Sequence, residues 1–407
     1  MYKRIHSLKN IKFLTKNKKN LNCGISNTES IFNNKVISFF NDLSNKIFKT
    51  NNLNLYPDLA SFGFFCRKNN LIKLKKRYLE FLPHRYGRGI TLHYAPSNVP
   101  LNFAYSLLVG LVSGNSCIVK LPSKNFNQSK LLVNLINQTI ALKKHEGIKK
   151  KLFLVKFAHS QEINDELSKI CDVRIIWGGN NTINEIRKSS IKERSFDVSF
   201  ADRYSVSIIN SKNYLFEKKY EIEAENFFND TLAFDQNACS SPRLIFWLGS
   251  KSLVKRARNI FWERFENKIL EKKYKHFGNT IVRKILSEQI AAIELGGDNT
   301  NINDTFKFVK KSIINKVPND LNPFISPGGF FLEYEGKKIN DFKKNINSKM
   351  QTLTYIGFDK TEIIKKLDLG RLRSIDRVVK NGRSSEFSFE WDGYDLIFFL
   401  SRKISTL

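Results

Sequence analysis

Short apolar runs alternate with helical patterns between residues 90 and 209, and this alternation constrains the fold more than any other feature of the chain. The apolar runs have the length of buried strands and lie at 90–94, 117–121, 152–157, 173–177 and 206–209. The helical patterns lie at 101–112, 129–144, 161–170 and 182–187. Elements in this order predict a parallel, doubly wound sheet, which binds ligands at the carboxyl ends of its strands.

A second α/β domain is predicted farther along the chain. The sequence FDQNACSSP at 234–242 leads into an apolar run at 244–248, and a long basic helix follows at about 253–275. Helical stripes at 31–47 and 71–81 precede the first strand. We therefore expect a helical segment over 1–85, a first α/β domain over 86–206, a second over 207–370, and a segment over 371–407 that returns to the first domain or forms a subunit interface.

The composition suits a globular protein without a metal site or a disulfide scaffold. The 407 residues are 41% hydrophobic and 13% aromatic, which is enough for a buried core. The five cysteines form neither a CxxC pair nor a cluster with zinc-ligand spacing. The most apolar stretch, at 101–112, falls short of the roughly 20 residues that span a bilayer, so we expect a cytoplasmic protein without an integral membrane segment.

The net charge of +30 results from 68 Lys and Arg residues against 38 Asp and Glu residues. Such an excess is typical of proteins that bind nucleic acid or an anionic membrane surface. Because the basic residues are dispersed and no nucleic-acid recognition motif occurs, we expect no nucleic acid partner. A basic surface also attracts phosphate-bearing ligands. The acid-free segment 1–28 is typical of a frayed basic N-terminus, and a targeting peptide stays open.

Three turns of the first domain carry candidate binding residues. Asn98 precedes a predicted helix, where its amide would either donate to an anion or merely cap the helix. Lys120 ends a predicted strand, where it would either reach ribose and phosphate oxygens or stay solvated. Gly178 and Gly179 form a strand-to-helix turn that would allow close approach of a dinucleotide, although the turn is not a GxGxxG motif.

Cys239 is the cysteine with the most reactive setting. It lies in a polar loop of small residues at 237–242, whose backbone amides would stabilise a developing negative charge. The remaining cysteines lie in or beside apolar runs and are expected to be buried, inert thiols. A buried thiol stays the alternative for Cys239 as well.

The order of these motifs resembles the aldehyde dehydrogenase superfamily, and most closely its acyl-CoA reductase branch, typified by the fatty acyl-CoA reductase of bacterial bioluminescence. The resemblance runs from about residue 56 to the C-terminus. It is carried by SNVP at 97–100, GNSCIVKLPS at 114–123, WGG at 177–179, DQNACSSP at 235–242 and WDGYDL at 391–396. It implies a Rossmann-type NAD(P)-binding domain over 86–206 and an α/β catalytic domain over 207–370.

The resemblance also assigns roles to the candidate residues. It makes Cys239 the nucleophile that holds the acyl group as a thioester, Asn98 the oxyanion donor and Lys120 the contact to the adenosine ribose. Ser123 and Lys124 stand where NAD-preferring relatives have a ribose-binding glutamate. A missing carboxylate and an added lysine favour the 2′-phosphate of NADPH, so we expect NADPH as cofactor, with NADH less favoured. No metal is required.

The resemblance finally implies a reaction. The segment at 200–205 lacks the glutamate that activates water in ordinary aldehyde dehydrogenases, although Asp202 lies nearby. A thioester that escapes hydrolysis suits an NADPH-dependent reduction of a long-chain acyl-CoA to the aldehyde with release of CoA. A CoA-acylating dehydrogenase for short aldehydes and a non-catalytic basic binding protein are the alternatives. We expect a homo-oligomer with acyl-transferring partner enzymes, and Asp392 and Asp395 are expected to brace a turn or a subunit contact.

Overall fold

The computed structural model describes residues 10–16, 27–276, 278–296 and 306–405, so most of the basic N-terminal segment lies outside the described residues. The chain divides into two compact units. Unit 1 comprises Met1–Ala201 and Tyr394–Leu407, and unit 2 comprises Asp202–Gly393. Each unit is built on its own six-stranded sheet.

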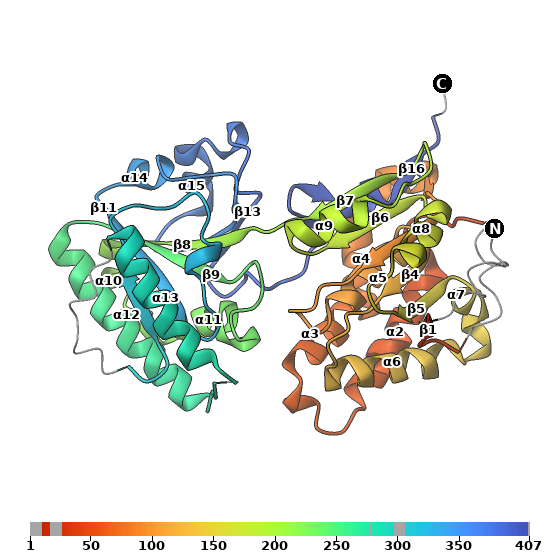
Figure 1. The fold of residues 1–407 in the computed structure, drawn as a ribbon, viewed down its shortest axis with the longest axis horizontal. Helices are drawn as coiled ribbons and strands as arrows, with labels where there is room; N and C mark the ends of the chain where they lie inside the picture. Colours follow the sequence, from red (N-terminus) through yellow and green to blue (C-terminus); the bar gives the residue numbers. More distant parts are fainter. Residues whose placement is uncertain (1–9, 17–26, 277, 297–305, 406–407) are drawn as a thin grey trace. The chain divides into compact units, whose positions relative to one another are not determined.

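The sheet of unit 1 has the strand order β1-β5-β4-β3-β6-β7 (Figure 1). All neighbouring strands are parallel except β1, which is antiparallel to β5. The chain runs from β3 outward to β4 and β5 and then crosses to β6 on the other side of β3, which makes the sheet doubly wound. The strands are β1 (Lys12–Phe13), β3 (Ile90–Tyr94), β4 (Ser116–Lys120), β5 (Leu152–Lys156), β6 (Val173–Trp177) and β7 (Phe196–Phe200).

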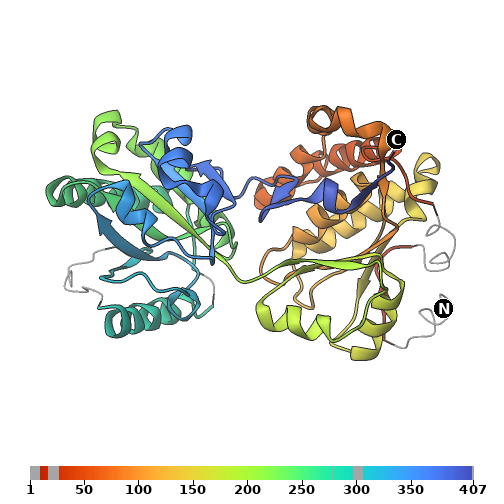
Figure 2. The same ribbon diagram turned by 90° about the horizontal axis from the view of Figure 1, so that it is seen from above.

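Helices cover both faces of this sheet (Figure 2). The red to gold helices lie on one face and the yellow-green helices lie on the other. The predicted helix at 71–81 is a helix only to Lys75, because a 3₁₀ turn containing Pro83 continues the chain to His84. The helices of unit 1 are α2 (Asn34–Phe48), α3 (Pro57–Phe65), α4 (Lys68–Lys75), α5 (Asn102–Val112), α6 (Asn127–Ile140), α7 (Glu146–Lys149), α8 (Gln161–Ile170), α9 (Asn180–Arg187) and α16 (Leu396–Phe399).

The end of the chain is bonded to the start of the unit 1 sheet. Strand β16 (Ser401–Lys403) pairs antiparallel with β2 (Arg85–Gly87), which directly precedes β3. The buried side chain of Asn115 donates to the carbonyl of Leu400 at 2.8 Å and accepts from the backbone N–H of Arg88 at 2.7 Å. The last residues therefore stabilise the entry of the chain into β3 and β4.

The turn between α5 and β4 requires a glycine. Gly114 has a φ of 85°, a conformation that side chains rarely adopt. A Cβ atom at this position would lie 2.0 Å from the carbonyl oxygen of Glu29. The backbone N–H of Glu29 donates to the carbonyl of Gly114 at 2.9 Å, so this close approach is part of the packing of the N-terminal segment.

The sheet of unit 2 has the order β10-β11-β9-β8-β12-β13, and all its strands are parallel. The run at 206–209 was expected to follow the strands of the first sheet, but it forms β8 in the middle of this second sheet. The strands are β8 (Tyr204–Asn210), β9 (Pro242–Leu248), β10 (Lys310–Ile313), β11 (Phe330–Gly336), β12 (Met350–Ile356) and β13 (Arg377–Lys380), and a short β14 (Glu390–Trp391) follows.

Buried polar groups complement the aromatic core of unit 2. Glu333 in β11 is fully buried, and its carboxylate accepts the indole N–H groups of Trp247 and Trp262 at 2.5 and 2.9 Å. The carboxylate of Glu266 accepts three backbone N–H groups, from residues 307–309, and thereby fixes the entry of the chain into β10. The helices are α10 (Ser211–Glu217), α11 (Tyr220–Asp230), α12 (Lys251–Glu271), α13 (Thr280–Leu295), α14 (Ile339–Lys343) and α15 (Lys360–Leu367).

Gly114→Ala is expected to lower the free energy of unfolding by about 1–3 kcal/mol, because a side chain at this φ is strained and the carbonyl of Glu29 must move. Gly147→Ala is the matched control, since nothing lies within 4 Å of its Cβ position and its φ is not positive. Urea denaturation of both variants measures the difference. Equal unfolding midpoints would contradict the role given to the Gly114 turn.

Candidate functional site

The carboxyl edge of the unit 1 sheet gathers six of the predicted site residues. Tyr94 at the end of β3 pairs with Lys120 at the end of β4 and with Ile176 near the end of β6, so the loops that follow these strands leave the sheet side by side. Asn98 follows β3, Lys120 ends β4 and precedes Ser123 and Lys124, and Gly178 and Gly179 follow β6. The structure therefore brings these residues to one edge, where a doubly wound sheet binds its ligand.

This edge is basic, and the loops that follow β3, β4, β5 and β6 carry no carboxylate. No Asp or Glu occurs in residues 94–100, 120–128, 156–160 or 177–184. Lys120 is half-buried, with Nζ 5.1 Å from the ring centroid of Phe157, and burial together with the charge of Lys156 lowers its pKa. Lys156 ends the neighbouring strand β5, and Lys124 lies in the exposed loop after β4. Positive charge without acidic neighbours in the loops fits a phosphate-bearing dinucleotide.

Asn98 and the glycine turn each precede a helix, but only the glycine turn contains the N-cap residue. Asn98 is exposed in the bend between β3 and α5, and the N-cap of α5 is Leu101, which leaves Asn98 outside the cap position. Gly179 is the N-cap of α9 with a φ of −65°, so its backbone does not require glycine. Gly178 has little room for a side chain, because a Cβ atom there would lie 3.1 Å from Cγ2 of Thr182.

Cys239 lies in unit 2, in the turn that leads into β9. Two preceding residues, Asp235 and Gln236, have left-handed backbone conformations with φ of 52° and 55°. The buried amide of Gln236 holds this strained turn, because its Nε2 donates to the carbonyls of Pro242 and Phe330 and its Oε1 accepts from the N–H of Gly329. The carbonyl of Cys239 accepts from the hydroxyl of Ser205 at 2.8 Å.

Cys239 differs from the other described cysteines in its accessibility. It is exposed, whereas Cys66, Cys117 and Cys171 are buried. Protein atoms around the sulfur displace water and, together with the charge of Asp392, raise the pKa of the Cys239 thiol to about 11. Hydrogen bonds from Gln351 and from nearby backbone amides lower this pKa and only partly offset the increase. Cys239 is therefore an exposed residue whose thiol is protonated in its resting state.

A polar network beside Cys239 was not predicted from the sequence. The Nε2 of Gln351 donates to the carboxylate of Asp392, and Nη1 of Arg203 lies 3.5 Å from the same carboxylate. Burial raises the pKa of Asp392, whose side chain is only 6% exposed. Asp395 braces a turn, as expected, since it caps α16 by accepting from the N–H of Phe398 at 3.0 Å. Asp392 also lies in a turn, with a φ of 50°, and its carboxylate in addition contributes to the electrostatics of the thiol.

The sequence of this chain matches a known protein family. Residues 70–260 match the family described as acyl-CoA reductase (LuxC). The predicted family resemblance is confirmed. The matched range contains every predicted site residue, from Asn98 to Cys239, whereas the WDGYDL motif at 391–396 lies beyond it.

Relatives of known name share less than half of their length with this chain. The long-chain acyl-protein thioester reductase of Photorhabdus luminescens is 28% identical over 202 residues, which cover 46% of this chain and 40% of the relative. The enzyme of the same name from Vibrio harveyi is 26% identical over 191 residues, which cover 46% of this chain and 36% of the relative.

Solved structures extend the likeness to nearly the whole chain. The lactaldehyde dehydrogenase of Escherichia coli aligns with 91% of this chain and 85% of its own length, with a TM-score of 0.61 and 10% identity. A variant of Thermus thermophilus 1-pyrroline-5-carboxylate dehydrogenase aligns with 94% of this chain and 82% of its own length, with a TM-score of 0.61 and 10% identity. The fold is that of the aldehyde dehydrogenases, as the sequence motifs predicted.

Two features are absent from the part of the chain that the structure describes. Within it, no three His, Cys, Asp or Glu side chains are grouped so that they could hold a metal ion. None of the described helices combines the length and the apolar character needed to cross a membrane.

Asp392→Asn is expected to increase the alkylation rate of Cys239 at pH 8 several-fold, because the carboxylate of Asp392 opposes ionisation of the thiol. With a pKa of about 11, the rate in the unchanged protein should rise about tenfold per pH unit between pH 7 and 10. Iodoacetamide kinetics followed by peptide mass spectrometry measure both effects.

Asp376→Asn is the control for this prediction. Asp376 also binds Arg203, but it is not among the groups that shift the pKa of Cys239. If both variants accelerate alkylation equally, the effect comes from releasing Arg203 and the account of the thiol is wrong.

Proposed function

We propose that the chain is a reductase that converts an acyl thioester to the aldehyde, with Cys239 as the acyl carrier and NADPH as the reductant. The observation that carries this proposal is the accessible Cys239 in a chain whose residues 70–260 match the acyl-CoA reductase family. The preferred substrate is a long-chain acyl-CoA. The relatives are named for protein-bound acyl thioesters, and such a donor would use the same exchange chemistry.

Acyl transfer needs three actions from the chain. The Cys239 thiol loses its proton and its sulfur bonds to the acyl carbon, after which the bond to the CoA sulfur breaks and CoA leaves as a thiol. Asn98 and a backbone amide of the cysteine loop stabilise the oxyanion that forms between these two events. Arg243 in β9 and Arg377 in β13 would favour ionisation of the thiol, because a Cys239 thiolate interacts electrostatically with both guanidinium groups, although burial lowers the pKa of each arginine.

Reduction needs a bound nicotinamide. When bound, NADPH supplies the hydride that reduces the thioester carbon. The aldehyde is then released, and Cys239 becomes a free thiol again. Lys120 would contact the adenosine ribose, and Ser123 and Lys124 would accept the 2′-phosphate. The turn at Gly178 and Gly179 would present the N-terminus of α9 to the diphosphate.

The unchanged protein should oxidise NADPH in the presence of a long-chain acyl-CoA and yield equimolar aldehyde and CoA. Cys239→Ser is expected to abolish both products, because serine does not form the thioester, whereas Cys117→Ser should retain activity because Cys117 is buried. Acyl-CoAs of graded length, with gas chromatography of the aldehydes, test the substrate range. Turnover in Cys239→Ser, or oxidation limited to short aldehydes with CoA, would overturn the proposal.

Ser123→Glu tests the choice of cofactor. NADPH is expected to exceed NADH by at least about tenfold in kcat/KM, since a 2′-phosphate near Lys120 and Lys124 gains charge-assisted hydrogen bonds worth roughly 1.5–3 kcal/mol each. A glutamate at 123 would repel this phosphate and accept from a free 2′-hydroxyl, which should weaken or reverse the preference. Steady-state kinetics at several salt concentrations separate this effect from diffuse attraction. An unchanged ratio in Ser123→Glu would contradict the assignment.

A further inference from the structure

Helix α13 in unit 2 turns its aliphatic side chains outward. Its exposed fractions are 54% for Ile281, 58% for Val282, 46% for Ile285, 55% for Leu286 and 81% for Ile293. The side of the helix that faces the unit carries Thr280, Lys284, Ser287 and Ala291, which are buried. A surface helix ordinarily has the opposite arrangement, with the apolar stripe facing the core. We call the five exposed aliphatic residues the α13 face.

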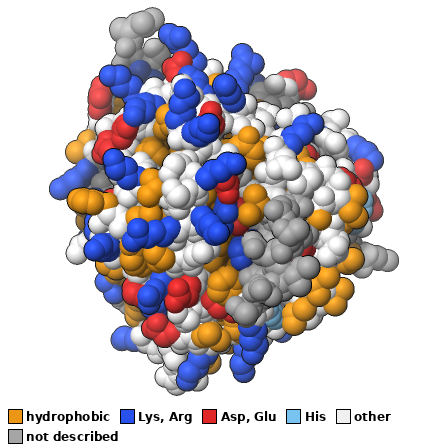
Figure 3. Space-filling model, turned by 90° about the vertical axis from the view of Figure 1, so that its left-hand side faces the viewer, with side chains coloured by type: hydrophobic (Ala, Val, Ile, Leu, Met, Phe, Trp, Pro, Cys, Tyr) orange, Lys and Arg blue, Asp and Glu red, His pale blue; other side chains and the backbone are white. Residues whose placement is uncertain are grey.

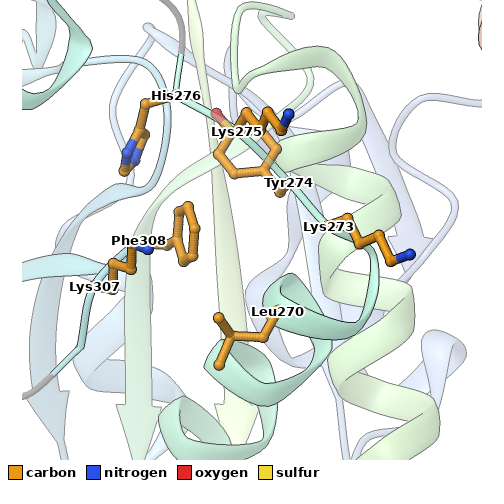
Figure 4. Close-up of a pocket in the computed structure, with 7 residues that line it drawn as sticks. All are labelled: Leu270, Lys273, Tyr274, Lys275, His276, Lys307 and Phe308. Carbon is orange, nitrogen blue, oxygen red and sulfur yellow. The ribbon is translucent and has the colours of Figure 1, made fainter.

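A basic cavity opens between the end of α12 and residues 307–308 (Figure 4). It has a volume of about 490 Å³ and an apolar floor formed by Leu270, Tyr274 and Phe308. Three exposed lysines, Lys273, Lys275 and Lys307, also line it, and none of them forms an ion pair with a described residue. The Nζ of Lys284 in α13 lies 2.8 Å from Nε2 of His276 and donates to the carbonyl of Phe308 at 2.5 Å, so the cavity lies beside α13, next to the side of the helix that faces the unit.

Exposed apolar side chains and nearby basic side chains are the two properties of a protein surface that binds lipid headgroups. Figure 3 draws the side of unit 2 that lies at the left of Figure 1, and hydrophobic side chains are interspersed there with many Lys and Arg side chains. The 16 residues of α13 extend over about 24 Å. An apolar helix face flanked by basic residues binds in the plane of a membrane surface, with the apolar side chains at the boundary between headgroups and acyl chains.

We propose that the α13 face and the lysines of the adjacent cavity dock unit 2 onto an anionic lipid surface. The aliphatic side chains of α13 would enter the headgroup boundary, while Lys273, Lys275 and Lys307 would contact lipid phosphates. Charge favours this occupant over a second copy of the chain. Two copies meeting through this face would bring the same lysines together in a chain of net charge +30, whereas an anionic bilayer neutralises them.

Co-sedimentation of the full chain with lipid vesicles tests this proposal without any requirement for catalysis. Vesicles of phosphatidylcholine with phosphatidylglycerol should bind the protein more tightly than vesicles of phosphatidylcholine alone, and high salt should weaken the binding. Ile285→Asp/Leu286→Asp should reduce the partition coefficient at least about tenfold, because two inserted side chains become charged. Lys273→Glu/Lys275→Glu should remove most of the preference for the anionic vesicles.

Phe216→Asp/Ile222→Asp is the matched control. Both side chains are exposed, at 84% and 60%, on other helices of unit 2, and the double substitution changes the net charge by the same amount. This control should bind like the unchanged protein, and circular dichroism verifies the folding of each variant. If both double variants lose vesicle binding equally, the binding results from diffuse attraction by the +30 charge, and the proposal is overturned. A halved mass of Ile285→Asp/Leu286→Asp in light scattering would assign the face to a second copy and overturn it as well.

Discussion

The buried amide of Gln236 connects the cysteine loop to two strands of the unit 2 sheet. It donates to the carbonyls of Pro242 at the start of β9 and Phe330 at the start of β11, and it accepts from the N–H of Gly329. Asp235 and Gln236 both have positive φ, a conformation that costs on the order of 1 kcal/mol or more per residue and persists only where the surroundings enforce it. The position of Cys239 therefore depends on hydrogen bonds inside the sheet and not on the loop alone.

The direction of the strands explains the rest of the arrangement. Because every strand of the six-stranded sheet of unit 2 is parallel, the chain enters β8, β9 and β12 at one edge of that sheet. Ser205, Cys239 and Gln351 thus meet at this edge although they lie far apart in sequence. In unit 1 the same rule applies to the opposite ends of the strands, where Lys120 and Lys156 meet because β4 and β5 are parallel neighbours.

Periodicity predicted the parts of the fold that are determined locally. The predicted strands at 90–94 and 173–177 coincide with β3 and β6, and the predicted helix at 161–170 coincides with α8. The run at 206–209 was recognised as a strand, but its sheet could not be deduced, because an apolar run has the same pattern in either sheet. The polar loop around Cys239 distinguished it from the other cysteines in the sequence. Gln351 and Asp392 carry no local signal, since their relation to the thiol arises only when β12 and the last turn of unit 2 are folded.

The proposed reaction depends above all on Cys239 as the acceptor of the acyl group. The most direct measurement is peptide mass spectrometry of the protein after incubation with a long-chain acyl-CoA in the absence of NADPH. We expect one hydroxylamine-sensitive acyl adduct, located on the peptide that contains Cys239, and its disappearance when NADPH is added. An adduct on Cys66, Cys117 or Cys171, or no adduct in a protein that still reduces acyl-CoA, would contradict the account.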